Sequence, residues 1–459
     1  MGETVSSLSP AFNRSVHVEL TDERTSSDAG AVALREALDA SAIVPHLEST
    51  LIDERDASRV VHPLSEQFRT LVLQRTQGWN DLHDAATLGP DRLWSVVRSD
   101  VRGLSPLQQP HPSQATLSRM IDSLAKPGNR QNLQQALVRL AGWRLRQPRG
   151  GRRLKSLTLD IDGLPIEVFG RQGSSAFNGH TASRIYSPLV ASVAETGDMV
   201  GALLREGRAA PSAEAADWIP SLVQALHAHA SDKVQVRFDA GFTGNPTLQA
   251  LEQHGIEYLG RLRPNPALDR KAEPYLKRPP GRPPYEPRQW CHEFSYQAES
   301  WPQPRRVVLV VQERPDDLLL HHFYIVTNLD SLWYTPEQVL RLYRRRGKAE
   351  AHMGELKSVL DVHLGSTDRG CSTVQQVDAR NEVQLLISLF AYEVLHVLRD
   401  LLQTRTGEGW SLARLREQVL KVAALTRIHA RQLRIHLGVA GRRWWPALMA
   451  GLAELSPAR

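Results

Sequence analysis

The sequence is poor in cysteine and contains no long uninterrupted apolar run. Its 459 residues include two cysteines, Cys291 and Cys371, which are far apart and form no CxxC pair. This excludes a disulfide-stapled scaffold and a zinc finger, and it suits a reducing compartment. No stretch approaches the roughly 18 apolar residues of a membrane span, and the start, "MGETVSSLSP", does not resemble a signal peptide. We therefore expect a cytoplasmic protein with no membrane partner.

Basic residues exceed acidic residues, and they are clustered. Lys and Arg number 56 against 50 Asp and Glu, for a net charge of +6. The clusters lie at 144–155, 276–284 and 342–348. Clustered cations indicate a polyanionic partner, and no basic amphipathic helix with a large aromatic face accompanies them, which favours nucleic acid over membrane. The alternative is an arginine-rich surface with no specific partner.

The first part of the chain has helical periodicity. A length of 459 residues predicts two or three domains, and residues 30–145 repeat apolar positions at helical spacing. Within them, "PSQATLSRMIDSLA" (112–125) starts with Ser113 as a helix cap. Its polar face, which includes Gln114 and Arg119, resembles the recognition helix of a helix-turn-helix. An ordinary amphipathic helix is an equally good interpretation.

The periodicity changes to two after a basic Gly/Pro linker. Strands and helices then follow in the order strand, strand, strand, helix, strand, helix, strand, which predicts an α/β core around a mixed sheet. The segments in that order are 154–162, 185–194, 199–207, 213–230, 233–241, 245–255 and 256–263.

The second half combines an insertion with long helices. Residues 264–320 begin with a Pro-rich stretch and continue with strand-like sequence, which predicts a β-rich insertion. A helix is expected over 335–360, with Thr335 as its cap, and further helices to the C-terminus. The expected division is a helical DNA-binding domain (1–145), a core in two parts (154–263 and 321–400), the insertion (264–320) and a C-terminal helical region (401–459).

Acidic residues end two of the predicted core strands. Asp160 and Asp162 are two residues apart on the first strand, so they share a face of the sheet. Asp239 ends a later strand, before a glycine turn. Neighbouring strands are about 4.8 Å apart, so carboxylates at such ends can share cations. Hard oxygen ligands suit Mg²⁺ or Mn²⁺, and two such ions promote in-line displacement at phosphorus.

The stretch "YRRRGKAEAHMGELK" (343–357) repeats polar residues at helical spacing. At about 100° per residue, four of them fall on one face. They are Tyr343, Arg346, Glu350 and Lys357. This face is either a solvated surface with ion pairs or one wall of an anion-binding active site. An acid among cations suits a metal ligand placed beside a polyanion, and Glu350 would complete a cluster of three carboxylates.

The same residues carry a family resemblance. The spacing Tyr343-x2-Arg346-x3-Glu350-x6-Lys357 resembles the YREK signature of the DDE transposases of bacterial insertion sequences, in the group named after insertion sequence four. Stretches such as "FNGHTASRIYSPLVASVAETGDMVGALLREG" and "VRFDAGFTGNPTLQALEQHGIEYLGRLR" are similar to the branch named after insertion sequence thirteen-eighty. The resemblance implies an RNase H-like core, interrupted by a β-rich insertion between the second aspartate and the glutamate.

The resemblance also implies roles for individual residues. Asp239 and Glu350 would be catalytic metal ligands, and Asp162 the first acid, with Asp160 as the alternative. A small residue and threonine usually follow that first aspartate in relatives, whereas Gly163 and Leu164 follow Asp162 here. The three basic and aromatic residues of the signature would contact DNA near the scissile phosphate.

The function implied is that of a transposase. Such an enzyme binds the ends of an insertion sequence, cleaves the phosphodiester with two divalent ions, and joins the freed 3′-hydroxyl to target DNA. Relatives cut as dimers or larger assemblies, so a homodimer on double-stranded DNA is expected, associated with the bacterial nucleoid. Two alternatives remain: a DNA-binding protein that has lost catalysis, and an RNase H-like nuclease without strand transfer. Filled acidic positions argue against the first, and the YREK helix with a large N-terminal domain argues against the second.

Overall fold

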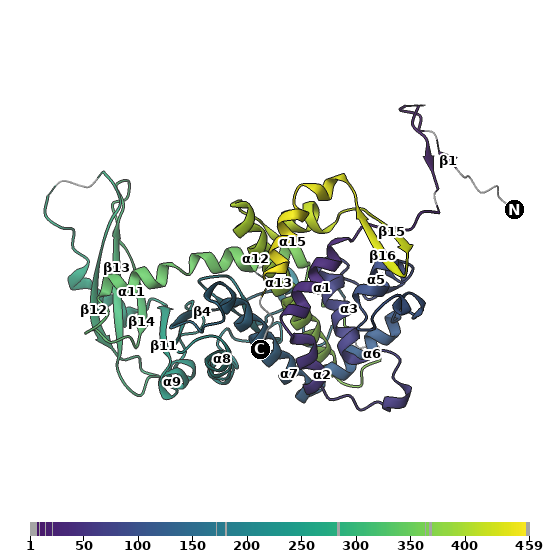
Figure 1. Cartoon of the computed structure of the whole chain (residues 1–459). Helices are drawn as coiled ribbons and strands as arrows, with labels where there is room; N and C mark the ends of the chain where they lie inside the picture. Colours follow the sequence, from purple (N-terminus) through teal and green to yellow (C-terminus); the bar gives the residue numbers. More distant parts are fainter. Residues whose placement is uncertain are drawn as a thin grey trace.

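The protein is elongated, with a large sheet at one end and a helical body at the other (Figure 1). The computed structural model describes residues 7–8, 10–13, 15–20, 22–170, 172–179, 181–281, 285–362, 364–366 and 370–455. The side chains of residues 7–8 and 348–350 lie outside this description. Among the described residues, no helix is both long and apolar enough to cross a membrane.

An eight-stranded mixed sheet forms the centre of the α/β part. From one edge to the other its strands are β12 (Arg288–Tyr296), β13 (Arg305–Glu313), β14 (His321–Thr327), β11 (Glu257–Leu262), β10 (Val234–Phe238), β4 (Leu157–Gly163), β8 (Leu189–Val193) and β9 (Met199–Leu203). Strands β4, β10 and β11 are parallel, and the other pairings are antiparallel. The strands expected within the insertion are therefore an extension of the central sheet, joined to it through β14.

Helices cover both faces of the sheet, which explains why its central strands β4, β10 and β11 are mostly buried. Helices α8 (Ala215–His229) and α9 (Asn245–Gln253) pack on one face through a large apolar cluster. On the other face, α11 (Pro336–Arg344) packs Val339 and Leu340 against the distal strands. Threonine 335 caps α11, as expected, by accepting a hydrogen bond from the Gln338 backbone.

The helical body combines the two ends of the sequence in one core. Its N-terminal helices are α1 (Gly30–Ala40), α2 (Ile43–Thr50), α3 (Leu64–Thr76), α4 (Asp84–Leu88), α5 (Arg92–Val97), α6 (Gln114–Leu124) and α7 (Pro127–Arg146). The 33-residue α13 (Val374–Thr406) runs through the middle and is buried along most of its length, including polar residues such as Asn381, Glu393 and His396. Helices α14 (Leu412–Leu415) and α15 (Trp445–Ala453) complete the body, and α10 (Pro266–Ala272) lies beside the sheet.

The C-terminal region differs from the expected run of helices. Residues 424–437 form an antiparallel hairpin, β15 (Ala424–His429) and β16 (Gln432–Leu437), and β15 also pairs with β3 (Thr25–Ser26). The physical reason is an alternation of period two in β16, where Leu433, Ile435 and Leu437 are half-buried and the residues between them are exposed. Pairing with β3, some 400 residues away in sequence, is invisible to local pattern.

Short strands elsewhere complete the fold. After β4, a three-stranded sheet of β5 (Ile166–Glu167), β7 (Ser183–Tyr186) and β6 (Ala176–Asn178) precedes β8. Near the N-terminus, β1 (Ser7–Leu8) pairs with β2 (Val18–Glu19) in the extension seen at the upper right of Figure 1.

Candidate active site

Two aspartates lie at the carboxyl ends of adjacent parallel strands, Asp162 near the end of β4 and Asp239 directly after β10. The register of β4 and β10 pairs Ile161 with Phe238. The residues that come next in the sequence are Asp162 and Asp239, respectively. Neighbouring strands lie about 4.8 Å apart, so the two acids are neighbours across the sheet edge. Each carboxylate accepts a nearby backbone N–H, from Gly163 at 2.9 Å and from Gly241 at 2.8 Å, respectively.

The helix pair α11 and α12 (Gly347–Leu360) brings Tyr343 and Arg346 to these acids. The Arg346 guanidinium forms an ion pair with Asp162. Burial raises the pKa of Tyr343, and Arg346 opposes that rise. Asp162 and Asp239 both raise the pKa of Tyr343 further, so both carboxylates lie within electrostatic reach of its phenol. The structure therefore gathers the two strand-end acids, one tyrosine and one arginine in one place.

The expected single helix over 335–360 is interrupted at this point. Helix α11 ends at Arg344 and α12 begins at Gly347, and the Arg346 backbone N–H donates to Tyr343 three residues earlier at 3.0 Å. An i to i−3 bond tightens the turn, and glycine is a weak helix former, which explains the break. Arg344 turns away to Gln289 of β12, and Arg345 is exposed.

The remaining signature residues lie on α12. Glu350 is one turn after Arg346, and its side chain lies outside the described part of the structure. Lys357 is two turns further on and exposed. Partial burial against the protein lowers the pKa of Lys357, and the Glu167 carboxylate opposes this shift. Lys357 therefore faces the small sheet that follows β4.

Asp160 differs from Asp162 in its surroundings, although both lie on one face of β4. The Asp160 side chain is 1% exposed and accepts two hydrogen bonds of 2.7 Å from Arg237 of β10. Arg237 also donates to the backbone carbonyl of Leu342 in α11 at 2.6 Å. Burial raises the pKa of Asp160, and Arg237 opposes that rise. This buried pair joins two strands to the helix that carries Tyr343, a contact that sequence analysis missed. A cation in the middle of an apolar strand, "VQVRF", was the available signal.

The candidate recognition helix is α6, capped by Ser113 as expected. Both Gln114 and Arg119 are exposed on it, and they line different hollows. The hollow at Gln114, of about 490 Å³, is shared with Phe169 of the segment after β5. The hollow at Arg119, of about 580 Å³, also includes Lys126.

A second group of acids is buried away from the sheet edge. Asp198, Glu393 and His396 have potential metal-ligand atoms within 4.8 Å of one another. The guanidinium of Arg144 from α7 already contacts both acids. Burial opposes ionisation of Asp198, but Arg144 outweighs it and lowers the Asp198 pKa.

Burial shifts the pKa values of the other two members of this group toward their neutral forms. Burial and the neighbouring Asp198 raise the pKa of Glu393 well above its ordinary value. Burial, with Arg144 and Arg399 adding to it, lowers the pKa of His396 well below its ordinary value. Since the buried guanidinium of Arg144 pairs with Asp198, Glu393 and Asp400, this group acts as a polar joint between α7, the β8–β9 turn and α13. Sequence analysis did not find it, because its members come from distant segments.

Comparison with known proteins places the chain among transposases. No curated protein matches the sequence. Among solved structures, the chain is similar to the piggyBac transposase in the cryo-EM structure of its synaptic complex with hairpin DNA, with 12% identity and a TM-score of 0.39, over 94% of this chain and 81% of that chain. The family described as transposase DDE domain group 1 matches residues 8–449. Since that match spans almost the whole sequence, the chain belongs to the DDE transposase family.

Proposed function

We propose that this transposase binds the ends of an insertion sequence, cleaves the phosphodiester there and joins the 3′-hydroxyl to target DNA. The observation that carries the proposal is the convergence of Asp162, Asp239, Tyr343 and Arg346 at the carboxyl edge of β4 and β10. Glu350 follows on the same helix pair, one turn after Arg346. The resemblance, to the branch named after insertion sequence thirteen-eighty, assigns Asp162, Asp239 and Glu350 to catalysis, and Tyr343 and Arg346 to DNA contacts near the scissile phosphate.

We further propose that the core is RNase H-like. Its elements follow one another as β4, β8, β9, α8, β10, α9 and β11. This is three strands, a helix, a strand, a helix and a strand, the order that the resemblance implies. The first three strands are antiparallel neighbours, and β10 and β11 are parallel to β4. The proposal therefore has support from strand order as well as from the acids.

The donor set at the sheet edge fits divalent metal. Asp162 and Asp239 offer hard carboxylate oxygens from adjacent strands, which suit Mg²⁺ or Mn²⁺, and we propose that Glu350 adds a third. Two such ions, when bound, polarise the phosphate and assist the attacking and leaving oxygens. Before metal and DNA bind, the positive charge of Arg346 compensates the negative charge of Asp162, since its guanidinium contacts that carboxylate.

The basic and aromatic residues have complementary tasks in this proposal. Arg346 can exchange its contact with Asp162 for a bidentate grip on a phosphate oxygen pair, which positions the scissile bond. Lys357 provides a second cation on α12, about three turns after Arg346. Tyr343 offers an aromatic ring against which a displaced base can stack, worth about 1–3 kcal/mol. We assign Asp160 a structural role, because its buried carboxylate is paired with the guanidinium of Arg237.

Three further points of the proposal concern organisation. Residues 1–145, whose helices share one core with α13 and the C-terminal region, supply the DNA-binding part, with Gln114 and Arg119 of α6 reading the element ends. The core comprises 154–263 and 321–400, the insertion comprises 264–320, and the C-terminal region comprises 401–459. The enzyme acts as a homodimer on DNA in the bacterial cytoplasm, which measurement of the mass of the protein–DNA complex will test.

The experiment that tests the function compares substitutions of two acidic residues, one at each end of strand β10. Asp239→Asn changes the acid after the carboxyl end of β10, and Asp232→Asn changes an exposed acid just before its other end. Both variants lose one negative charge. With DNA that carries the element ends and with Mg²⁺, we expect Asp239→Asn to bind normally but to yield neither cut nor joined products. Asp232→Asn should match the unchanged protein.

The same assay separates the two alternative functions. A protein that binds end DNA but produces no metal-dependent cleavage would be a DNA-binding derivative of a transposase. A protein that cuts but never joins the 3′-hydroxyl to a second duplex would be a nuclease without strand transfer. Full activity of Asp239→Asn would refute the assignment of the active site.

A further inference from the structure

The C-terminal hairpin presents one strongly basic face. In the register of β15 and β16, Arg427 is directly opposite Arg434, and His429 is opposite Gln432. Side chains alternate between the two faces of a strand, so these four residues share a face with His436. All five are exposed: Arg427, His429, Gln432, Arg434 and His436. We call this surface the basic ribbon face.

The opposite face of the hairpin fixes its orientation. Ile435 and Leu437 pack against the large core of the helical body, and Ala424 and Thr426 are buried. Strand β15 is also held by β3, and Gly438 donates to the Ala423 carbonyl at 2.8 Å. Since one face is committed to the core, the basic ribbon face must point to solvent.

The hairpin carries little compensating negative charge. The chain contains no Asp or Glu from residue 418 to residue 453, and the cations of that segment are Lys421, Arg427, Arg431, Arg434, Arg442 and Arg443. An acid from elsewhere in the chain reaches the face: Glu23 lies 3.3 Å from Arg427, with the two side chains 57% and 62% exposed. An ion pair this exposed contributes little, and like charges directly opposite each other destabilise a hairpin.

The turn of the hairpin adds a cation at its tip. Ala430 and Arg431 both have positive φ angles, of 50° and 62°. Hairpin turns with two such residues match strand twist but favour Asn and Gly, and a non-glycine residue in this region costs about 1–3 kcal/mol. The chain therefore places an arginine at the tip of the ribbon despite a local cost in stability.

We propose that the basic ribbon face binds double-stranded DNA, with the tip at Arg431 entering the major groove. A two-stranded ribbon fits that groove, which is about 12 Å wide, and strands of six residues extend about 20 Å. When DNA binds, its negatively charged phosphates would reduce the repulsion between Arg427 and Arg434. This inference rests on the proposed function, because it takes DNA to be the substrate.

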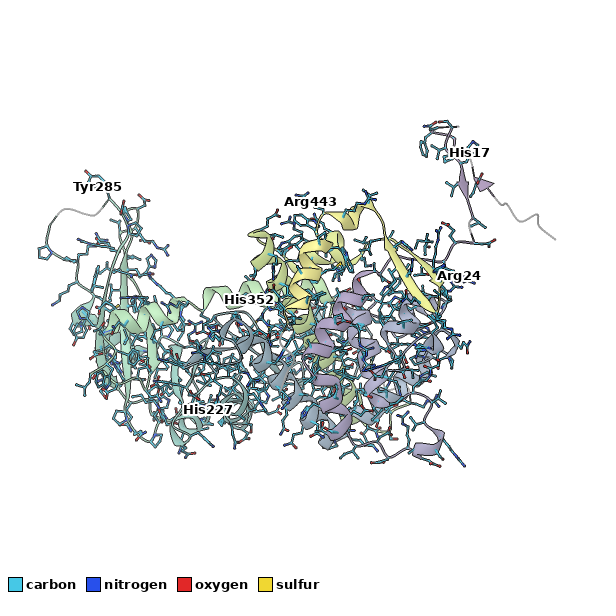
Figure 2. The ribbon with its side chains drawn as sticks, in the orientation of Figure 1. His17, Arg24, His227, Tyr285, His352 and Arg443 are labelled. Carbon is cyan, nitrogen blue, oxygen red and sulfur yellow. The ribbon has the colours of Figure 1, made fainter. Side chains whose placement is uncertain are left out.

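The ribbon is a DNA contact separate from the candidate active site and from α6. Figure 1 shows β15 and β16 at the end of the molecule opposite β12 and β13. Figure 2 labels Arg24 beside the hairpin and Arg443 on the same upper side of the molecule. Arg443 is exposed and stacks over Trp444 with 4.3 Å from its guanidinium carbon to the ring centre. Arg442 and Arg443 thus add two exposed cations between the ribbon and the start of α15.

The test measures how DNA affinity depends on salt. The variant Arg427→Gln/Arg434→Gln in the full-length protein removes two cations from the basic ribbon face. Binding to a short labelled duplex of random sequence is followed across a range of salt concentrations. Because each lost phosphate contact reduces the slope of log K against log salt by about 0.9, we expect the slope to fall by roughly two units. Thermal stability should not fall, since both side chains are exposed.

The matched control is Arg270→Gln/Arg314→Gln. These two exposed arginines lie in α10 and after β13, so the variant has the same net charge with an intact ribbon. Its salt slope should equal that of the unchanged protein. A gain-of-charge variant, Gln432→Arg, adds a cation to the basic ribbon face and should steepen the slope by about one unit.

Each outcome decides a different point. Equal slopes for the ribbon variant and the control would overturn the ribbon proposal while leaving the proposed function intact. A ribbon variant that binds DNA normally but loses self-association would overturn it in favour of a contact between copies of the chain. If the unchanged protein binds no DNA and cleaves none, the proposed function itself fails.

Discussion

The carboxylate of Asp160 accepts two hydrogen bonds from the guanidinium of Arg237, both 2.7 Å long, on neighbouring parallel strands. The same arginine holds the Leu342 carbonyl of α11. One buried pair therefore ties β4, which contains Asp162, and β10, which precedes Asp239, to the helix that carries Tyr343. This contact gives the two aspartates of β4 different tasks: Asp160 holds the site together, and Asp162 is left for chemistry.

The first prediction separates the two aspartates by what they affect. Asp160→Ala leaves Arg237 buried and unpaired, which costs about 3–5 kcal/mol. Chemical denaturation should therefore show a large loss of stability. Asp162→Ala should abolish metal-dependent cleavage with little loss of stability, since its carboxylate is at the open edge. If Asp160→Ala were stable but inactive and Asp162→Ala active, the two roles would be exchanged.

The second prediction concerns adjacent arginines. Arg346→Lys should impair cleavage at saturating DNA although charge is kept, because lysine lacks the planar fork that grips a carboxylate or phosphate. Arg346→Ala should be more severe still. Arg345→Ala removes an exposed side chain and should change the cleavage rate little. A greater loss of rate from Arg345→Ala than from Arg346→Ala would mean that the helix faces the site differently.

The third prediction uses two glycines with similar backbone strain. Gly197 has a φ of 81°, and a Cβ there would lie 2.5 Å from the His352 ring of α12. Gly255 has a φ of 65°, with open space around its Cβ position. An alanine at either site costs about 1–3 kcal/mol of backbone strain.

Only Gly197→Ala should also slow cleavage, because His352 is two residues from Glu350 and its ring must move. Figure 2 labels His352 on α12, where that helix approaches the helical body. Cleavage rates at saturating DNA, measured with the stability of both variants, provide the comparison. Equal cleavage rates for Gly197→Ala and Gly255→Ala would show that the β8–β9 turn does not influence the active site.

The fourth prediction concerns sequence recognition. Gln114→Ala and Arg119→Ala should each relax the preference for element ends over random DNA, because base-edge contacts carry specificity. Their non-specific affinity should fall much less. Competition binding with end and random duplexes measures both quantities. Equal losses of affinity for the two DNAs would indicate that α6 is an ordinary amphipathic helix and not a recognition helix.

The fifth prediction concerns acid stability. Burial lowers the pKa of His111, beside the start of α6, from 6.5 to about 4, and Arg98 adds to the shift. Between these values the unfolded chain binds a proton that the folded protein does not. Stability contributed by neutral His111 is therefore lost as pH falls from about 6.5 to about 4, by about 1–3 kcal/mol.

The control is His111→Gln, which removes the titrating ring. Urea unfolding near neutral pH and at about pH 4.5 should show a smaller decrease in stability for this variant than for the unchanged protein. The difference isolates His111 from other buried histidines such as His396, whose pKa is also lowered. The same decrease in both proteins would contradict the assignment.

Much of the fold follows from local pattern. Period-two and helical stretches predicted the order of β4, β8, β9, α8, β10, α9 and β11, and Ser113 and Thr335 cap their helices as expected. The break between α11 and α12 was not predicted, because "YRRRGKAEA" has helical spacing throughout. The strands 424–437 were read as helix, because their partner strand β3 is at the other end of the chain.

The sequence by itself determined which residue types are available for chemistry and where they recur. Spacing placed Tyr343, Arg346, Glu350 and Lys357 on one helical face, and strand ends marked Asp162 and Asp239. Only the tertiary structure decided that Asp160 is closed off by Arg237, and that Asp198, Glu393 and Arg144 form a buried joint. The physical reason is that periodicity reports a neighbour on the same element, whereas burial and charge pairing depend on elements brought together by folding.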